Sequence, residues 1–298
     1  MEAISLENVT KSYDGVHAVN DVTLRVRRGA ILGLLGPNGA GKTSTIRMIM
    51  NILVPDAGSI RVFDQPVSDE TRQSIGYLPE ERGLYPRMQV RAVIMFLAAL
   101  RGMAESEADR RARKWLERFE LGDWSEKQVH DLSKGMQQKV QFISAVLHEP
   151  SLVILDEPFS GLDPLNAATV KDIMLEMRDQ GSTVVLSTHR MEQVERMCDS
   201  ICLIDKGHNV LDGDLRAIKQ SYGKNTVQIE FTGPDTFLSH PAVASVTRLG
   251  VGAEAKLKPG ADPQQVLRAA VESGAEITRF ALLEPSLTDI FIEKTGHA

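Results

Sequence analysis

Three features that mark other classes of protein are scarce or missing in this sequence. The two cysteines, Cys198 and Cys202, have no second pair of metal-binding side chains nearby, so we expect reduced core thiols rather than a zinc site. The longest uncharged apolar stretches, such as residues 92–100, are far shorter than the roughly 20 residues that cross a bilayer. A basic segment followed by an apolar one is missing from the first residues, so no secretory signal is expected and the cytoplasm is the predicted compartment.

An excess of positive charge is missing as well. The formal net charge is −6, so a broad basic face for nucleic acid is not expected, although a local basic groove stays open. With 42% hydrophobic and 25% charged residues, the composition is typical of a soluble globular protein, and 298 residues suffice for two domains. Nucleotide binding depends on a local loop and is not excluded by this charge.

The pattern of apolar residues predicts an α/β fold. Alternation of apolar and polar residues over the first thirty positions indicates short antiparallel strands. Continuous apolar runs separated by helical segments then indicate a parallel sheet buried on both faces. These runs are residues 30–36, 151–156, 182–188 and 200–205. Residues from about 86 to 150 are rich in Ala, Leu, Arg and Glu, which predicts a helical insertion.

A second, smaller domain is predicted to follow the polar run at residues 220–225. We therefore expect domains at residues 1–222 and 223–298. The second contains four short strand patterns and helices near residues 263–273 and 285–295, which predicts a small α+β domain. We identify no acid pair, nucleophile set or metal cluster in it, so regulation or subunit contact is the default expectation.

The segment GPNGAGKT at residues 36–43 matches the phosphate-loop pattern G-x-x-x-x-G-K-[ST] at every fixed position. It lies between a predicted buried strand and a predicted helix, and this order favours a phosphate site over an ordinary glycine-rich turn. Backbone N–H groups would meet phosphate oxygens, Lys42 would reach the terminal phosphates, and the Thr43 hydroxyl would bind Mg²⁺. The candidate nucleotide-binding residues here are Gly36, Pro37, Asn38, Gly39, Ala40, Gly41, Lys42, Thr43 and Ser44.

Two other predicted strands end in side chains that suit catalysis. Asp156 ends one apolar run, where it can hold Mg²⁺, and Glu157 beside it can act as general base for an attacking water. Consecutive acids at a strand end can also form a solvated turn, but the phosphate loop upstream favours the catalytic interpretation. His189 follows the run at 182–188, and on spacing alone a structural role and a phosphate contact are equally supported.

The stretch DLSKGMQQKVQF at residues 131–142 predicts a helix that begins at Ser133 as N-cap. Apolar residues recur after it at helical spacing. Two interpretations fit: an ordinary amphipathic helix with a loose first turn, or a helix N-terminus whose free N–H groups meet an anion. Taken by itself, the stretch favours the first.

Together these segments resemble the ATP-binding subunit of ABC transporters, over residues 1 to about 222. GPNGAGKT looks like Walker A, VILDEP like Walker B, IGYLPE occupies the Q-loop position and LSKGMQ the signature position. The resemblance implies a P-loop NTPase with a RecA-like core, an antiparallel β subdomain and a helical subdomain, and the hydrolysis of ATP with Mg²⁺. It assigns Tyr13 to adenine stacking, Glu80 to the Q-loop, and Ser133 and Gly135 to the γ-phosphate. It also assigns Asp163 to the D-loop and His189 to the switch.

Three positions depart from the family pattern. Glu80 stands where the Q-loop has glutamine; it keeps an oxygen that can face Mg²⁺ or the lytic water, but it adds negative charge beside the triphosphate. Lys134 and Met136 replace a glycine and the glutamine of the signature, whereas Ser133 and Gly135 are retained. The resemblance therefore implies that the signature contacts with the γ-phosphate persist.

The segments YLPEERGLYPRM, LSKGMQQKVQF and LLEPSLTDIFIEKTG narrow the resemblance to ATPase subunits of ABC-2-type exporters. It implies two ATPase subunits facing head to tail, as a homodimer or heterodimer, and a separate transmembrane permease that holds them at the cytoplasmic face of the cell membrane. The expected permease contact is the segment 82–88.

Two rival functions are a soluble ABC protein acting on ribosomes or DNA, and a small-molecule kinase or GTPase that shares only the phosphate loop. The single motif set, short insertion and acidic charge argue against the first, so no nucleic-acid partner is expected. The signature and D-loop segments argue against the second.

Overall fold

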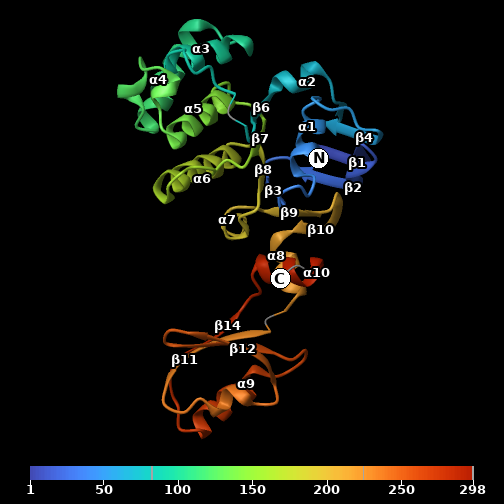
Figure 1. Cartoon of the computed structure of the whole chain (residues 1–298), viewed down its shortest axis with the longest axis vertical. Coiled ribbons are helices and arrows are strands. Elements are labelled where there is room, and N and C mark those ends of the chain that lie inside the picture. The colour runs from blue at the N-terminus through green and yellow to red at the C-terminus, as the bar shows by residue number, and fades with distance from the viewer. Residues whose placement is uncertain (82, 224, 297–298) are drawn as a thin grey trace. The chain divides into compact units, whose positions relative to one another are not determined.

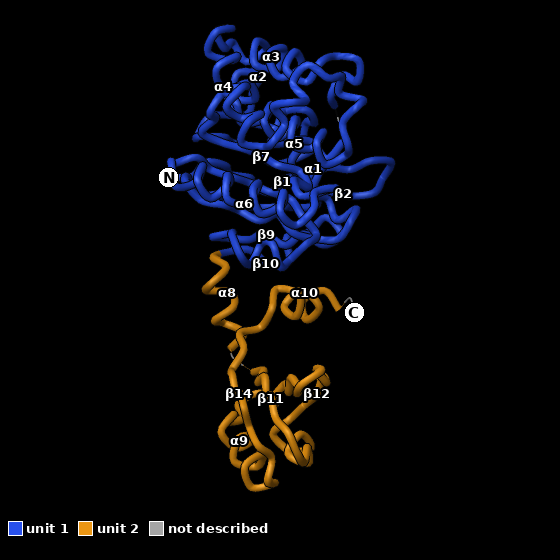
Figure 2. The backbone as a smooth tube through the Cα atoms, turned by 90° about the vertical axis from the view of Figure 1, so that its left-hand side faces the viewer, with its two compact units in different colours: residues 1–213 blue, residues 214–298 orange. Residues whose placement is uncertain are grey.

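A computed structural model describes residues 1–81, 83–223 and 225–296 of the chain (Figure 1). The chain divides into two compact units, Met1–Gly213 and Asp214–Ala298 (Figure 2). Helix α8 (Leu215–Ser221), which the sequence analysis assigned to the first domain, belongs to the second unit. Lys294 near the end of the chain lies 6.0 Å from the ring centroid of Tyr222, directly after this helix.

The first unit contains an antiparallel sheet with the strand order β2-β1-β4-β5. Its strands are β1 Glu2–Tyr13, β2 Val16–Arg27, β4 Ala57–Val62 and β5 Gln65–Pro66. Leu6 and Leu24 pair across β1 and β2 and are both buried. One face of this sheet therefore lies on the core, as the alternation of apolar and polar residues predicted.

The second sheet of this unit has the order β10-β9-β3-β8-β7-β6. Its strands are β3 Ile31–Leu35, β6 Ile75–Leu78, β7 Leu152–Asp156, β8 Thr183–Thr188, β9 Ser200–Asp205 and β10 His208–Asp214. The strand β8 lies between β3 and β7 and is parallel to both. Every residue of these three strands is buried, which explains their continuous apolar sequences, and their carboxyl ends meet at one edge of the sheet.

Helices from three parts of the first unit pack on its sheets. Helix α1 (Lys42–Ile49) contacts β4 and β7, α5 (Lys134–Val146) contacts β6, and α6 (Pro164–Asp179) contacts β8. Shorter helices are α2 (Asp69–Ser74) and α7 (Met191–Glu195). Across the described ranges, no helix combines the length and the apolar composition that a membrane span requires.

The two cysteines are buried and form no disulfide, as the sequence predicted. Burial raises the pKa of the thiols of Cys198 and Cys202. Neither thiol is therefore in its reactive thiolate form at neutral pH.

The helical insertion consists of α3 (Val90–Leu100), α4 (Glu105–Arg118) and α5, with 3₁₀ turns at Gly122–Trp124 and Val129–Asp131. Its core is aromatic. The rings of Phe119 and Phe142 meet edge to face with centroids 5.8 Å apart, and Trp115 stacks on Phe119 at 6.0 Å.

Helix α5 is not the simple amphipathic helix that its sequence favours when taken alone. Its buried residues include three polar ones, Gln138, Lys139 and Gln141. Lys139 Nζ donates to the carbonyl oxygen of Phe119 at 3.0 Å, and Gln141 Nε2 donates to that of Glu81 at 3.3 Å. Polar side chains enter the buried side of this helix because backbone carbonyl groups of neighbouring segments accept their hydrogen bonds.

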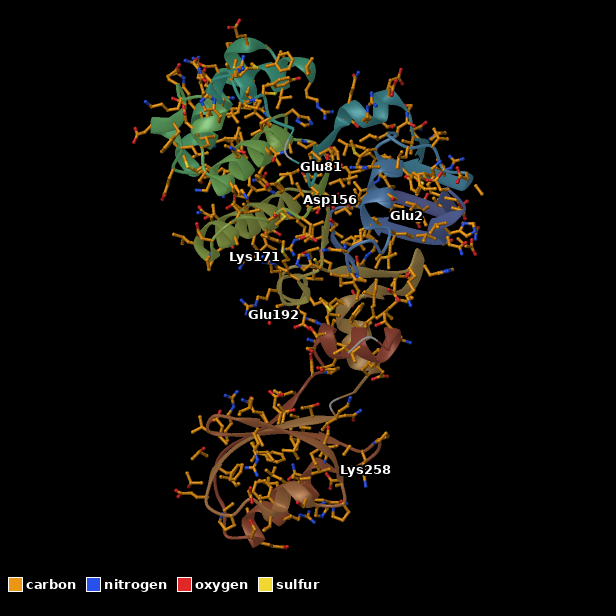
Figure 3. All side chains as sticks on the ribbon, viewed as in Figure 1. Glu2, Glu81, Asp156, Lys171, Glu192 and Lys258 are labelled. Atoms are coloured by element: carbon orange, nitrogen blue, oxygen red, sulfur yellow. The ribbon has the colours of Figure 1, made fainter. Side chains whose placement is uncertain are left out.

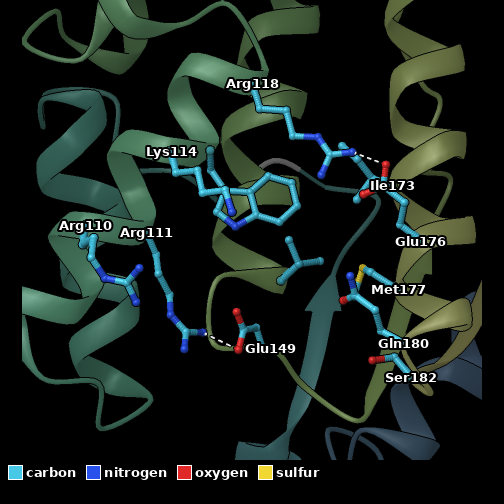
Figure 4. Close-up of a pocket in the computed structure, with 12 residues that line it drawn as sticks. Arg110, Arg111, Lys114, Arg118, Glu149, Ile173, Glu176, Met177, Gln180 and Ser182 are labelled. Atoms are coloured by element: carbon cyan, nitrogen blue, oxygen red, sulfur yellow. Dashed lines mark hydrogen bonds and ion pairs between the residues drawn. The ribbon is translucent and has the colours of Figure 1, made fainter.

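Two ion pairs hold α4 of the insertion to neighbouring segments of the first unit (Figure 4). Arg118 of α4 pairs with Glu176 of α6 at 2.6 Å, and Arg111 of α4 pairs with Glu149 at 3.0 Å. All four residues line a cavity of about 190 Å³ together with Trp115. Because these pairs are partly exposed, each contributes only about 1 kcal/mol or less. The attachment of the insertion therefore depends mainly on buried apolar side chains.

The second unit is built on an antiparallel sheet with the order β12-β13-β11-β14. Its elements are β11 Thr226–Thr232, β12 Val243–Leu249, β13 Gly252–Leu257, α9 Pro263–Glu272, β14 Glu276–Leu283 and α10 Leu287–Thr295. Ile229 of β11, Ala255 of β13 and Val266 of α9 share one buried cluster. The predicted α+β character of the C-terminal region is confirmed.

Replacing Phe142 with alanine should lower the free energy of unfolding by about 3–5 kcal/mol, because it leaves a cavity under Phe119. The matched control is Phe96→Ala, since Phe96 is 40% exposed and should change the free energy of unfolding by about 1 kcal/mol or less. Urea denaturation followed by circular dichroism measures both. Equal effects of the two substitutions would contradict the assignment of Phe142 to the core.

Candidate active site

The phosphate loop joins β3 to α1, and two of its glycines occupy positions where no side chain fits. Gly36 has φ +149° and Gly41 has φ +112°. A Cβ atom at Gly36 would lie 2.1 Å from the carbonyl oxygen of Ile204, and one at Gly41 would lie 2.3 Å from that of Ala18. Both the backbone angle and the space require glycine, which lets the loop curl tightly enough to form an anion-binding nest of N–H groups.

Lys42 is the first residue of α1, and its ammonium group is buried inside the loop. Nζ donates to the carbonyl oxygens of Gly36 at 2.8 Å and Pro37 at 3.0 Å. Burial lowers the pKa of Lys42, and three nearby carboxylates, with Glu157 first among them, oppose this shift.

One cavity of about 180 Å³ brings the phosphate loop together with acidic residues from two other segments. Its lining residues are Ala18, Asn38, Gly39, Gly41, Lys42, Thr43, Ser44, Glu80, Asp156 and Glu157. The predicted residues Gly36, Pro37 and Ala40 belong to the loop but do not line the cavity. Motifs far apart in the sequence therefore meet at the carboxyl edge of the parallel sheet, where ligands bind in such folds.

Asp156 ends β7 and is 1% exposed. Ser187 Oγ donates to its Oδ1, whereas Oδ2 is buried and has no hydrogen-bond partner within the described part of the chain. A buried carboxylate oxygen without a partner is costly unless a ligand satisfies it. Carboxylate and hydroxyl oxygens are ligands that Mg²⁺ accepts, so Asp156, Thr43 and Glu80 fit this ion.

The protein side chains alone do not form a complete metal site. Among residues 1–81, 83–223 and 225–296, no group of three or more His, Cys, Asp or Glu side chains is arranged to hold a metal ion. Mg²⁺ usually keeps several waters and binds through one or two carboxylates and the phosphates of a substrate. The arrangement around Asp156 therefore suits a metal ion that arrives with a nucleotide.

Glu157 has φ +49°, in the left-handed region that costs a non-glycine residue free energy. Its N–H lies 3.2 Å from both the carbonyl oxygen and Oγ of Ser187. Its carboxylate accepts from the backbone N–H of His189 at 3.1 Å and from Thr188 Oγ1 at 3.3 Å, and lies 2.8 Å from His189 Nδ1. The end of β8 thus fixes this carboxylate at the cavity.

Five residues assigned by resemblance lie outside the lining of the cavity, and one of them, His189, reaches it only through its contact with Glu157. Tyr13 ends β1 and is 43% exposed. Ser133 is the N-cap of α5, where its Oγ accepts a hydrogen bond from the first turn, and Gly135 lies within that turn. Asp163 is the N-cap of α6 and makes an equivalent bond. A single chain therefore does not bring these residues into the lining of the cavity.

Sequence reasoning missed three residues around the site. Ala18 lines the cavity and approaches Gly41 through its backbone carbonyl, so its side chain carries no signal. Ser187 and Thr188 hold Asp156 and Glu157. These two hydroxyl residues end an apolar run directly before His189, and their position was a signal that could have been used.

Two family models match the chain. The model described as ABC transporter matches residues 19–160. The model described as ATP-binding protein DrrA1-3-like, C-terminal domain, matches residues 213–295. The second match begins close to the division between the two units of the structure.

Known relatives are similar over nearly the whole chain. An uncharacterised ABC transporter ATP-binding protein of Bacillus subtilis (strain 168) is 44% identical and covers 98% of both chains. A Nod factor export ATP-binding protein of Rhizobium sp. (strain N33) is 33% identical over 99% of this chain and 97% of its own. A solved structure titled as the ATP-binding subunit of an ABC transporter matches 74% of this chain and 93% of its own, with 33% identity and a TM-score of 0.70.

Replacing Gly41 with alanine should weaken ATP binding by at least about tenfold, because the new Cβ would push the loop away from Ala18. Isothermal titration calorimetry with ATP measures the affinity. The matched control is Gly29→Ala, since Gly29 also has positive φ (+67°) but its nearest neighbour to a Cβ would be 3.8 Å away. An unchanged affinity in Gly41→Ala would contradict the tight loop geometry.

Proposed function

The chain belongs to the family of ABC transporter ATP-binding proteins, and from this premise we propose that it is the ATPase subunit of an ABC-2-type exporter. Binding and hydrolysis of ATP are the characteristic activity of this family. The match of residues 213–295 to the DrrA1-3-like domain supports the exporter type, as does the relative that is named for Nod factor export. Its transported substrate would bind in a separate membrane subunit.

The triphosphate of ATP occupies the cavity beside the phosphate loop, held by N–H groups of residues 36–44 and by Lys42, while Tyr13 stacks on the adenine. The cavity is lined by one ammonium group, that of Lys42, and by the carboxyl groups of Glu80, Asp156 and Glu157. This arrangement repels an anion unless a cation offsets the negative charge. Thr43, Glu80 and the unpaired Oδ2 of Asp156 would hold Mg²⁺, which neutralises charge on the phosphate oxygens when bound.

Glu157 is the proposed general base that accepts a proton from the attacking water. The observation that carries this proposal is its carboxylate at the cavity, held by the contacts with His189 and Thr188. A base must be held within hydrogen-bond reach of the water that it activates. His189 orients this carboxylate and thereby serves hydrolysis without itself taking the proton.

A second ATPase subunit completes each site. Ser133, Gly135 and Asp163 do not line the cavity of their own chain, although free N–H groups at the start of α5 suit an anion. We assign them to the nucleotide held by the partner's phosphate loop. Lys134, the first residue of α5, adds positive charge at the same end, so the departure from glycine there favours this contact.

A groove beside the helical insertion is the proposed docking surface for the membrane subunit. It has a volume of about 430 Å³ and mainly apolar walls, in which Ile52 and Leu100 are 49% and 62% exposed. Gly83 and Leu84 of the predicted contact segment also line it, while Arg82 lies outside the described residues. Exposed apolar patches of this kind suit an amphipathic helix of a partner. The chain would thus be peripheral, at the cytoplasmic face of the membrane.

Replacing Glu157 with glutamine should lower the rate of ATP hydrolysis by about 10²–10⁴-fold while leaving ATP binding intact, because the amide cannot accept the proton. Phosphate release measures the rate, and size-exclusion chromatography with ATP should detect an accumulated dimer. Glu192→Gln is the control, since Glu192 is an exposed residue of α7 that does not line the cavity. Wild-type turnover in Glu157→Gln would contradict the proposed base.

Replacing Leu100 with glutamate should abolish recovery of the chain with its multi-helix membrane partner from detergent-solubilised native membranes, because a charge in the groove must be desolvated on docking. The ATPase rate of the free chain should stay within about twofold of the wild type, since Leu100 is exposed. The control is Val271→Glu, at a residue of α9 that is 62% exposed. Recovery of wild-type chain only with ribosomes or DNA would instead support the soluble rival.

A further inference from the structure

Gln138 connects the signature helix directly to the segment that carries the proposed base. It lies on α5 and is 3% exposed. Its Nε2 donates to the carbonyl oxygen of Pro158 at 3.2 Å and to that of Glu157 at 3.5 Å. The packing of an amphipathic helix does not require a buried amide at this position. Neither the proposed ATP binding nor the proposed general base uses it.

Two elements besides its own turn bond to Glu157. The N–H and the carboxylate are held by Ser187, Thr188 and His189 at the end of β8. The carbonyl oxygen accepts from the N–H of Ser160 at 3.0 Å within its own turn and from Gln138 of α5 at 3.5 Å. Because Glu157 is in the left-handed region, its conformation persists only while the surrounding groups hold it on both sides. A displacement of α5 therefore changes the orientation of the carboxylate.

The first turn of α5 is also packed tightly on the same segment. A Cβ atom at Gly135 would lie 2.9 Å from the carbonyl oxygen of Gly161. Closely packed groups of this kind transmit displacement instead of absorbing it. The start of α5 and the segment 157–161 should therefore move together.

We propose that Gln138 is a positioning residue that couples the signature helix to Glu157 of the same chain, so that contact of α5 with the partner's nucleotide orients this chain's own base. The inference rests on the proposed function, which places Ser133 on that nucleotide. It goes beyond the phosphate contact itself, because it links occupation of one site of a dimer to the catalytic geometry of the other. Gln138 acts through Glu157 and touches neither the nucleotide nor the water.

The test compares two buried polar residues of α5 in the full chain, Gln138 and Lys139. Gln138→Met removes the amide donor and keeps the side-chain length. Lys139→Met is the matched control, because Lys139 is also buried on α5 and its Nζ donates to a backbone carbonyl oxygen, that of Phe119 at 3.0 Å, which lies outside the segment that carries Glu157. Gln138→His restores a donor at a similar distance and tests for rescue.

We expect Gln138→Met to lower kcat for ATP by about 10- to 100-fold with an unchanged KM, because a misplaced base impairs the chemical step and not binding. Lys139→Met should lower Tm by a similar amount but leave kcat within about twofold, and Gln138→His should recover part of kcat. Combined with Ser133→Ala, Gln138→Met should add little further loss, since both changes interrupt the same coupling.

Three outcomes would overturn the coupling. They are a kcat for Gln138→Met within about twofold of that for Lys139→Met, an equal loss in Gln138→His, or additive losses with Ser133→Ala. Failure of the proposed function is distinguishable, because it appears as an inactive wild-type chain or as normal turnover in Glu157→Gln. If only the coupling is absent, the wild-type chain still hydrolyses ATP and Glu157→Gln still loses turnover.

Discussion

The left-handed backbone of Glu157 is the constraint on which the rest of the site depends. A residue in this conformation is stable only between rigid neighbours, and β7 and β8 provide them because every residue of both strands is buried. The same strand ends place Asp156 against Ser187 and Glu157 against His189. The apolar strands thus determine the position of two carboxylates whose own chemistry opposes burial. Figure 3 shows Asp156 in the middle of the first unit.

Charge is the second constraint on the site, and it opposes the burial that the apolar strands impose on charged side chains. Lys42 is buried, which lowers its pKa, and the nearby carboxylates stabilise its charged form. Those carboxylates outnumber it in the cavity, and Glu80 is one of them. The site is thus arranged for a triphosphate together with a cation, and less well for a bare anion.

The sequence predicted the parts of the structure that depend on local pattern. Continuous apolar runs located β3, β7, β8 and β9, and the spacing of GPNGAGKT located the phosphate loop, because only glycine tolerates the φ of Gly36 and Gly41. Contacts between segments could not be predicted in this way. Ala18 acts through its backbone, and Gln138 resembles any polar residue of a helix until the carbonyl groups that face it are known. The structure divides after Gly213 and the sequence analysis after 222, because the grouping of α8 with the second unit depends on contacts made in the fold.

Helix α5 explains why LSKGMQQK is hard to interpret locally. Its start carries Lys134 and backbone N–H groups that suit an anion, while its buried side carries Gln138, Lys139 and Gln141, which bond to carbonyl groups of its own chain. An ordinary surface helix needs neither feature. The first feature suits the proposed anion contact, and the second ties α5 to neighbouring segments of its own chain. The departures from good helix-forming sequence are therefore explained by contacts outside the helix.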